Sequence, residues 1–499
     1  MRSLQSMREV RPDDGEIGII WRLAGRADSQ APVDNMQRRL RLAGNARLGQ
    51  NDAGIDGHLG NVGLSWDESM DRRAFLRSSS FVAASAAAGG AMAEEPHMRR
   101  WTEQRWLLDN IIQANGMDWD QGRSSGLVAA IGPESQADIA GIRARIKKFA
   151  DFAPAFEAVA RRRESVAIQA ERDGFAVSAR DNYYAAAQYW GSAQWSIHEN
   201  SQQNYFYNSK KRDLFAKYAA LADHHIEATW IPFQGKALPG WLHLPPDYTG
   251  GKIPAILAIP GMDGYKEKTI GLHGDRWLDR GFAVLAIEGP GQYECPLLGI
   301  YVTMQGWAEA GKACYGWMAA RPEIDPARIG IAGVSFGSFA GTIVAGAEPR
   351  FKACALQGMH HEPGGFVHDE EASPTFKRRF MYMCGFVDEA AYDEFAKTLV
   401  LDEYFSEIKM PYLCLAGESD ELSPLKYTEE LFKLMKGPKR LVVYQDGRHA
   451  ISGVPAANLG PNPGPLLADW MLEQIAGKPF PSERWFVEAS GRVVKTPLY

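Results

Sequence analysis

Between residues 253 and 447, short apolar runs alternate with helical patterns, and this alternation restricts the fold more than any other feature. Each run is hydrophobic throughout and most end in glycine, as is typical of strands buried on both faces of a sheet. Strands separated by helices predict a mostly parallel α/β sheet with helices on both faces. The runs read IPAILAIPG, FAVLAIEGPG, RIGIAGVS, KACALQG, PYLCLAG and RLVVYQDG.

The segments around these runs complete the predicted sheet. Residues 226–246 contain two alternating runs that predict a β-hairpin ahead of the first parallel strand. Helical patterns between the runs occupy 272–281, 305–322, 338–348 and 427–437. Residues 359–410 form a longer connection than one crossover requires, and we interpret it as a short helical cap. The predicted catalytic domain therefore covers 226–499.

The region before the hairpin differs in pattern. Residues 94–225 place apolar residues three and four apart with charges between them, and no alternating strand pattern occurs. This pattern predicts an all-helical domain that precedes the sheet.

A possible export signal lies further upstream. Residues 70–93 contain paired arginines, a short Ala- and Gly-rich apolar run and a final A-x-A site, which is typical of a twin-arginine signal peptide. The run is too short for a stable membrane span, although a surface amphipathic helix is an alternative. We therefore expect a periplasmic or secreted protein, and we interpret residues 1–69 as a disordered leader or a misassigned start.

Charge and motif content exclude several classes of function. The formal net charge is −6 and no dense run of Lys and Arg occurs, which argues against nucleic acid as a partner. The five cysteines form no C-x-x-C pair, and no H-E-x-x-H motif occurs. We therefore predict no metal and no cofactor.

A G-x-S-x-G motif, GVSFG, lies where the third apolar run ends and a helical pattern begins. A strand, a sharp turn and a helix form the nucleophile elbow, which lifts its serine above the sheet. Gly333 and Gly337 would allow the strand and the helix to approach closely. Ser335 is therefore the candidate nucleophile, and the alternative is an ordinary serine between two glycines.

Serine needs a base to become a useful nucleophile, and in this arrangement the acid and the histidine follow it in the chain. Asp420 follows the PYLCLAG run and His449 follows the RLVVYQDG run, both at predicted carboxyl ends of strands. We assign His449 as general base and Asp420 as the residue that orients it. Taken singly, either could be a capping or loop residue. The alternative acids are Glu418, Glu421 and Asp446.

An oxyanion hole requires two donors beside the nucleophile. The backbone N–H of Phe336, directly after Ser335, is one candidate. The N–H of Met262, in the PGMDGYKEK loop, is the other, with Gly261 leaving room for the backbone. Gly261 could instead be an ordinary turn residue without a role in the oxyanion hole.

Several segments together resemble one branch of the α/β hydrolases. They are PGMDGYKEK, AIEGPGQYE, GVSFGSFAG, EPRFKACAL, LAGESDELSP and YQDGRHAISG. This branch includes 2,6-dihydroxypseudooxynicotine hydrolase and the fermentation/respiration switch protein family, which is dienelactone-hydrolase-like. The resemblance implies the α/β-hydrolase fold, with a substrate cleft between the helical domain and the sheet. It also implies hydrolysis of an ester, or of a C–C bond next to a carbonyl.

Residues outside the triad could shape a pocket for a small, possibly aromatic substrate. Tyr183, Tyr184, Trp190 and Trp195 of the helical domain could stack on such a substrate, although aromatic residues at helical spacing more often belong to a core. A homodimer is compatible with aromatic residues exposed on that domain.

The QGMHHEPGG segment after the fourth apolar run offers further candidates. His360, His361 or Glu362 could face the cleft, with a solvated loop as the alternative. The leading hypothesis is an exported serine hydrolase acting on a small carboxylic ester. A C–C bond hydrolase acting on a ketone or β-diketone with the same triad is the alternative. A binding or regulatory protein on a hydrolase scaffold is the third.

Overall fold

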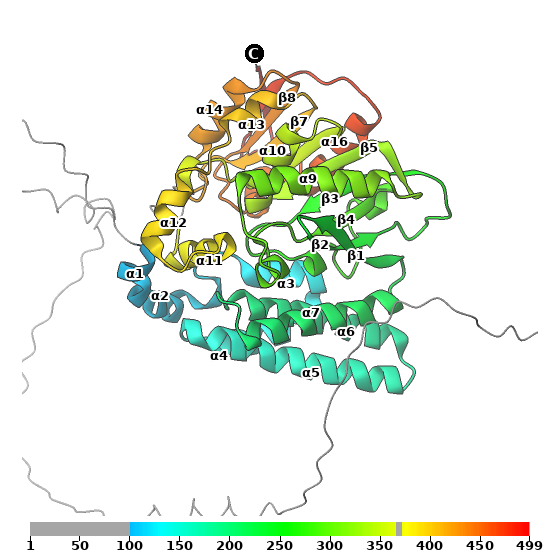
Figure 1. The fold of residues 1–499 in the computed structure, drawn as a ribbon, viewed down its shortest axis with the longest axis vertical. Coiled ribbons are helices and arrows are strands. Elements are labelled where there is room, and N and C mark those ends of the chain that lie inside the picture. Colours follow the sequence, from blue (N-terminus) through cyan, green and yellow to red (C-terminus); the bar gives the residue numbers. More distant parts are fainter. Residues whose placement is uncertain (1–99, 366–371, 499) are drawn as a thin grey trace, which may run out of the picture. The chain divides into compact units, whose positions relative to one another are not determined.

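The computed structural model describes residues 100–365 and 372–498. The expected leader and twin-arginine signal lie outside the described residues. The part of the chain described before Ile226 contains helices and no strand (Figure 1). These helices are α1 (Arg100–Gln104), α2 (Leu108–Asn115), α3 (Arg123–Ile131), α4 (Gln136–Arg145), α5 (Phe152–Arg172), α6 (Ala176–Trp195) and α7 (Gln202–Leu221).

Helices α5, α6 and α7 are the longest of this region and stack side by side in one layer (Figure 1). Aromatic side chains fill the space between them. Tyr184 packs edge-on against Tyr218 with ring centroids 4.9 Å apart, and Trp190 lies 5.3 Å from Tyr207. Burial of these rings, each a large apolar area, holds the three helices together.

The rest of the chain builds one ten-stranded sheet in the order β1-β2-β4-β3-β5-β6-β7-β8-β9-β10. Strands β4 to β9 in this order pair in parallel, whereas β1, β2 and β10 pair antiparallel at the two edges. The strands are β1 (Ile226–Phe233), β2 (Lys236–His243), β3 (Ile253–Ile259), β4 (Ala283–Ile287), β5 (Ile324–Val334), β6 (Ala353–Gln357), β7 (Tyr412–Gly417), β8 (Lys439–Tyr444), β9 (Glu483–Val487) and β10 (Val493–Pro497).

The hairpin and the six apolar runs are confirmed as β1 to β8. The terminal pair β9 and β10 was not predicted. Its signal is present in the sequence, because apolar residues flank a Ser-Gly turn in which Gly491 has a φ of 85°. Both strands are only partly buried at the sheet edge, so their hydrophobic pattern is weak.

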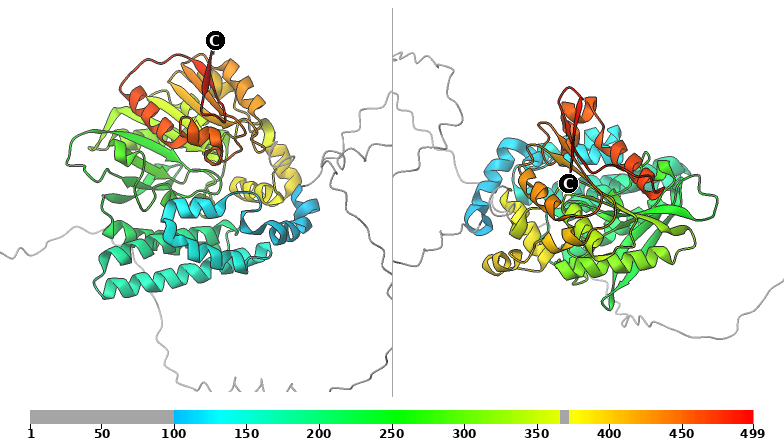
Figure 2. Two further views of the ribbon diagram at one scale, coloured as in Figure 1. Left: turned by 180° about the vertical axis from the view of Figure 1, so that it is seen from behind. Right: turned by 90° about the horizontal axis from the view of Figure 1, so that it is seen from above.

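Helices cover both faces of the sheet, as the continuous apolar runs predict (Figure 2). On β3, Leu257 and Ile259 face the core shared with α9 and α10, whereas Ile256 and Ala258 face the core shared with α16. This alternation follows from the two-residue period of a strand. The helices are α8 (Glu294–Leu297), α9 (Met304–Ala319), α10 (Phe336–Ala347), α11 (Pro374–Cys384), α12 (Glu389–Ala396), α13 (Asp402–Glu407), α14 (Leu425–Leu434), α15 (Pro455–Leu459) and α16 (Pro463–Ile475).

The helix expected over 272–281 is wrong. Only a 3-10 turn, Leu278–Arg280, forms there. Gly274 has a φ of 104°, which a right-handed helix cannot contain, and the Asp275 carboxylate accepts from the backbone N–H of Trp277. Local side-chain capping therefore replaces a helical turn at this point.

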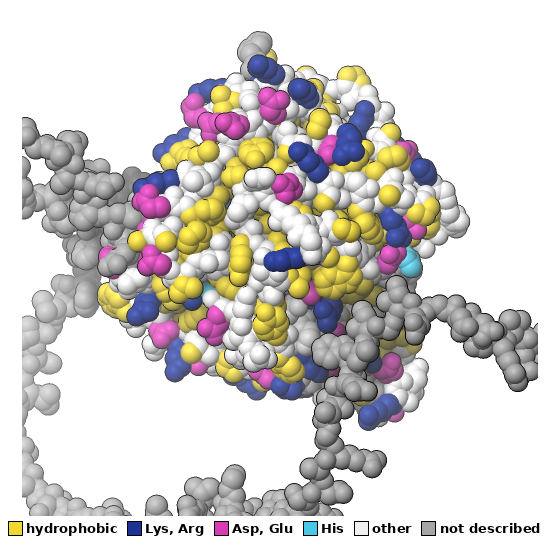
Figure 3. Space-filling model, in the orientation of Figure 1, with side chains coloured by type: hydrophobic (Ala, Val, Ile, Leu, Met, Phe, Trp, Pro, Cys, Tyr) yellow, Lys and Arg dark blue, Asp and Glu magenta, His cyan; other side chains and the backbone are white. Residues whose placement is uncertain are grey.

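The segment expected to form the cap carries α11, α12 and α13 between β6 and β7. None of the helices in the described residues combines the length and the apolar content that a bilayer crossing requires. On the face shown in Figure 3, acidic and basic side chains are interspersed among apolar ones.

Candidate active site

Ser335 occupies the turn between β5 and α10, and its backbone is strained. Its φ of 56° and ψ of −126° lie outside the regions that residues with a Cβ usually adopt. A Cβ on Gly333 would lie 2.2 Å from the carbonyl oxygen of Gly337, and one on Gly337 would lie 2.2 Å from that of Ile259. The two glycines of the motif therefore permit the close approach that holds this turn.

His449 joins Ser335 to Asp420. The His449 Nε2 lies 2.9 Å from the Ser335 Oγ, and its Nδ1 lies 2.9 Å from the Asp420 Oδ2. Three strand ends supply these groups, since Ser335 follows β5, Asp420 follows β7 and His449 follows β8. The structure brings the three predicted residues together in a hydrogen-bonded chain.

Asp420 is fixed by its own loop. Its Oδ1 accepts hydrogen bonds from the backbone N–H groups of Leu422 and Ser423, both at 3.0 Å. The side chain is buried, so its remaining oxygen is aimed at His449.

The alternative acids have other contacts. Glu418 accepts from the backbone of Asp446, while Asp446 itself is exposed, and Glu421 faces Arg448 at the surface at 3.8 Å. Asp420 is thus the carboxylate that the structure places against His449.

The predicted oxyanion donors come from two elements. The backbone N–H of Met262 belongs to the loop after β3, and that of Phe336 lies at the start of α10, directly after Ser335. Among the described residues, neither N–H donates to a protein acceptor. A Cβ on Gly261 would lie 3.1 Å from the Ser335 Cβ, so the loop after β3 passes directly against the serine. Gln292 holds this loop by donating to the Pro260 carbonyl at 2.6 Å.

A cavity of about 520 Å³ opens beside Ser335. Its floor is the loop from Gly261 to Lys268, and its opposite wall comes from α3, α5 and α6. The cavity therefore lies between the helical region and the carboxyl ends of the strands, as the family resemblance implies. Aromatic side chains contribute much of its wall, namely Phe152, Phe156, Trp195, Tyr265, Trp277 and Tyr293.

Tyr183, Tyr184 and Trp190 do not line this cavity, which corrects the expectation that they stack on substrate. All three are fully buried among the helices. The Tyr183 hydroxyl donates to Glu171 and the Tyr184 hydroxyl donates to the Ile270 carbonyl, so these groups serve packing. Trp195, at the end of α6, is the member of the predicted aromatic set that reaches the cavity.

His360 and His361 also lie outside the wall of this cavity. The His360 ring packs 5.2 Å from the Phe339 ring and 6.0 Å from the Phe336 ring, behind the nucleophile turn. Burial, together with the charge of His449, lowers the pKa of His360 to about 3. His361 contacts the Thr428 hydroxyl at 3.0 Å, and burial lowers its pKa to about 3 as well.

Two cationic residues of the cavity wall were missed by sequence reasoning. Arg123 of α3 stacks over Trp195 at 4.0 Å and pairs with Asp263 at 3.3 Å. Lys268 lines the cavity from the loop after β3. The quoted PGMDGYKEK segment contains Asp263 and Lys268, but nothing in its pattern shows which charges face inward.

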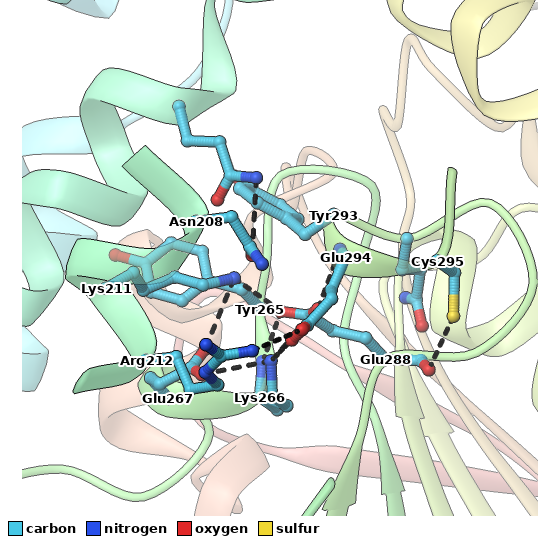
Figure 4. Close-up of polar contacts among 12 residues, drawn as sticks. Asn208, Lys211, Arg212, Tyr265, Lys266, Glu267, Glu288, Tyr293, Glu294 and Cys295 are labelled. Atoms are coloured by element: carbon cyan, nitrogen blue, oxygen red, sulfur yellow. Dashed lines mark hydrogen bonds and ion pairs between the residues drawn. The ribbon is translucent and has the colours of Figure 1, made fainter. Parts of the chain in front are cut away.

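A buried charge network ties helix α7 to this same loop (Figure 4). The Lys211 Nζ lies 2.8 Å from Glu288 and 3.4 Å from Glu267. The Lys266 Nζ lies 3.0 Å from Glu267, 3.2 Å from Glu288 and 2.9 Å from Glu294. Burial opposes ionisation of Glu267, but the Lys211 and Lys266 charges outweigh it and lower the pKa of Glu267 to about 2.

In residues 100–365 and 372–498, the structure contains no group of three or more His, Cys, Asp or Glu side chains arranged as metal ligands.

Comparison with known proteins agrees with this geometry. The profile of the prolyl oligopeptidase family matches residues 308–475, which contain Ser335, Asp420 and His449. The α/β hydrolase xenA of Xenoacremonium sinensis is 29% identical over 211 residues, covering 40% of this chain and 49% of that protein. The 2,6-dihydropseudooxynicotine hydrolase of Paenarthrobacter nicotinovorans is 27% identical over 275 residues, covering 54% of this chain and 71% of that protein.

Among solved structures, the crystal structure of 2,6-dihydroxy-pseudo-oxynicotine hydrolase superposes with a TM-score of 0.61 and 24% identity, covering 71% of this chain and 97% of that one. The sheet topology and this superposition show the α/β-hydrolase fold, which confirms the predicted fold. The relatives are named hydrolases, in agreement with the family resemblance and the enzyme class that the sequence predicts. The chain spans about half the length of the xenA relative.

Proposed function

We propose that this α/β hydrolase is a serine hydrolase that cleaves a small carboxylic ester through an acyl-enzyme. The observation that carries the proposal is His449, which spans Ser335 and Asp420 with 2.9 Å on each side. Histidine placed between a hydroxyl and a buried carboxylate can remove the hydroxyl proton while the carboxylate fixes its tautomer. The small-molecule substrate would occupy the adjoining cavity of about 520 Å³.

The mechanism follows from these positions. The Ser335 Oγ attacks the ester carbonyl carbon and its proton passes to the His449 Nε2. The backbone N–H groups of Met262 and Phe336 stabilise the oxyanion that forms. The alcohol leaves with the proton from His449, and a water activated by His449 then releases the acid and restores Ser335.

A fluorophosphonate probe tests this assignment, because it labels only an activated serine. We expect Ser335 to be labelled and 4-nitrophenyl acetate to be hydrolysed, and both activities to be lost in Ser335→Ala. Ser452→Ala is a matched control, since Ser452 is an exposed serine close to His449 in sequence. Absence of labelling in a folded wild-type sample would favour the binding or regulatory alternative.

C–C bond hydrolysis of a ketone or β-diketone with the same triad is a second candidate, and the similarity to 2,6-dihydropseudooxynicotine hydrolase favours it, since the branch that the sequence resembles includes that enzyme. Glu362 does not line the cavity. Its carboxyl is buried, and its Oε1 lies 3.3 Å from the His360 Nε2. Burial, with the nearby Asp420 acting in the same direction, raises the pKa of Glu362 to about 8.

Paired assays separate the two candidates. If C–C cleavage is the activity, aryl-ketone or β-diketone substrates should be cleaved faster than 4-nitrophenyl acetate. Faster cleavage of 4-nitrophenyl acetate would favour ester hydrolysis. Loss of both activities in Ser335→Ala would assign them to the same triad.

A further inference from the structure

Lys268 differs from the other partly buried charged groups around the cavity because none of the described residues forms an ion pair or a hydrogen bond with its ammonium. Its Nζ lies against Gly126 of α3, where an added Cβ would be 3.1 Å away, and both residues line the cavity. The ammonium is therefore held at the cavity wall between the loop after β3 and α3.

The charged side chains of Arg123 and Asp263, which also line the cavity, already have partners in the protein. The Arg123 guanidinium pairs with Asp120 and lies 3.3 Å from Asp263, and it stacks between Trp119 at 4.6 Å and Trp195 at 4.0 Å. Asp263 also accepts from the Trp195 Nε1 at 2.6 Å. Asp263, the carboxylate whose charge acts on Lys268, is therefore already ion-paired with Arg123 and hydrogen-bonded to Trp195.

The remaining charged groups of the wall are Asp275 and Arg276. Asp275 caps the backbone N–H of Trp277 at 2.7 Å, and Arg276 is exposed at the cavity rim. Among the described residues that line the cavity, Lys268 is thus the partly buried cation that forms no ion pair with a carboxylate.

We propose that Lys268 binds an ionised carboxylate of the substrate, so that the preferred substrates are esters that carry a second, free carboxylate on an apolar or aromatic body. This inference rests on the proposed ester hydrolysis by Ser335. Lys268 and Ser335 line one cavity, and the aromatic side chains of the same cavity suit the apolar part of such a molecule.

The electrostatics of the cavity support this assignment. Burial lowers the pKa of Lys268 to about 8; Asp263 opposes this change and Arg123 adds to it. An entering carboxylate would stabilise the charged ammonium and raise its pKa again. Charge-assisted hydrogen bonds of this kind contribute about 1.5–3 kcal/mol, which corresponds to roughly ten- to hundredfold in affinity.

Two matched ester pairs test the proposal with the full chain at pH 7. One pair is 4-nitrophenyl hydrogen glutarate and its neutral glutaramate analogue, which places the carboxylate on the acyl side. The other is 4-acetoxybenzoate and 4-acetoxybenzamide, which places it on the leaving group. We expect at least one anionic ester to exceed its neutral analogue about tenfold or more in kcat/KM, mainly through KM.

Variants assign this preference to Lys268. Lys268→Met should abolish the preference and leave the neutral ester within about threefold, while Lys268→Arg retains part of it. Lys433→Met is the charge-matched control, because Lys433 pairs with Glu430 at the surface. Fluorophosphonate labelling of each variant verifies that the triad is intact.

The outcomes distinguish the two proposals. If wild-type protein is labelled and cleaves neutral esters without preferring either anionic one, or if Lys268→Met keeps the preference, the Lys268 inference is overturned and ester hydrolysis stands. If no ester is cleaved and Ser335 is not labelled, the proposed function fails. Calorimetric binding of both ester pairs then still tests Lys268, since tighter binding of an anionic ester should disappear in Lys268→Met.

Discussion

At the scale of single residues, Ser335 combines a strained backbone with a precise hydrogen bond. A φ of 56° costs a residue with a Cβ about 1–3 kcal/mol, and the flanking strand and helix hold it there. The same turn places the Oγ 2.9 Å from His449. The strained turn therefore serves the site, because it directs the Ser335 hydroxyl away from the sheet and toward the His449 imidazole.

Asp420→Asn tests the orienting role of the carboxylate. The asparagine Oδ1 could keep the two N–H bonds from Leu422 and Ser423, but its amide would face the His449 Nδ1 and favour the wrong tautomer. We expect kcat for ester hydrolysis to fall about 10⁴-fold, with little change in thermal stability. Glu421→Gln, which removes an exposed carboxylate close to Asp420, should stay within about twofold. Comparable losses in both variants would contradict the assignment.

At the scale of elements, the nucleophile turn depends on how closely α10 approaches β3. Gly337 lies in the first turn of α10, and a Cβ there would be 2.2 Å from the Ile259 carbonyl oxygen. Backbone cannot yield as a flexible side chain can, so this contact fixes the distance between the serine turn and the loop that carries Met262. The oxyanion site is thus assembled by the packing of two elements.

Gly337→Ala should separate these elements. We expect fluorophosphonate labelling of Ser335 to slow at least about 10²-fold, because a displaced oxyanion donor costs about that much. Gly316→Ala on α9 is the control, since nothing lies within 4 Å of the added Cβ and alanine favours an exposed helix by up to about 1 kcal/mol. Unchanged labelling in Gly337→Ala would show that the turn tolerates a wider spacing.

At the scale of the whole molecule, the buried charge network joins the helical region to the sheet. Lys211 comes from α7, Glu267 from the loop after β3 and Glu288 from the end of β4. Removal of one partner from such a network leaves an uncompensated buried charge, which is strongly destabilising. The network therefore fixes the loop that forms the cavity floor against the helices that form its wall.

Lys211→Met should reduce the free energy of unfolding by about 3–5 kcal/mol at pH 7, measured by urea titration. The pKa of Glu267 is lowered in the folded protein, so its contribution is present above pH about 4 and is lost as the pH falls toward about 2. Without Lys211 this carboxylate should protonate more readily, and the loss should be smaller at pH 5 than at pH 7.

Lys210→Met provides the control in the same helix. Lys210 pairs with Glu164 at 2.7 Å in a partly exposed position, so its removal should cost at most about 1 kcal/mol. Equal effects of the two variants would contradict a special role for the buried network.

The sequence predicted the strands and the catalytic candidates correctly where those candidates directly follow the end of a strand. The apolar runs located β3 to β8, and Ser335, Asp420 and His449 each follow one of them. It failed for Tyr183, Tyr184 and Trp190 because α6 is buried on nearly all sides. A helix that is apolar all round carries no periodic signal for the side that meets a cavity.

The sequence by itself determined the parallel sheet, the nucleophile turn and the order of serine, aspartate and histidine, because local pattern and chain order suffice for these. Only the tertiary structure decided that Trp195 reaches the cavity and that Lys211 meets Glu288, 77 residues away. It also decided that Arg123 forms an ion pair with Asp263, whereas Lys268 forms none with the described residues. Charge pairing and cavity lining depend on which distant segments pack together, and no local pattern encodes that choice.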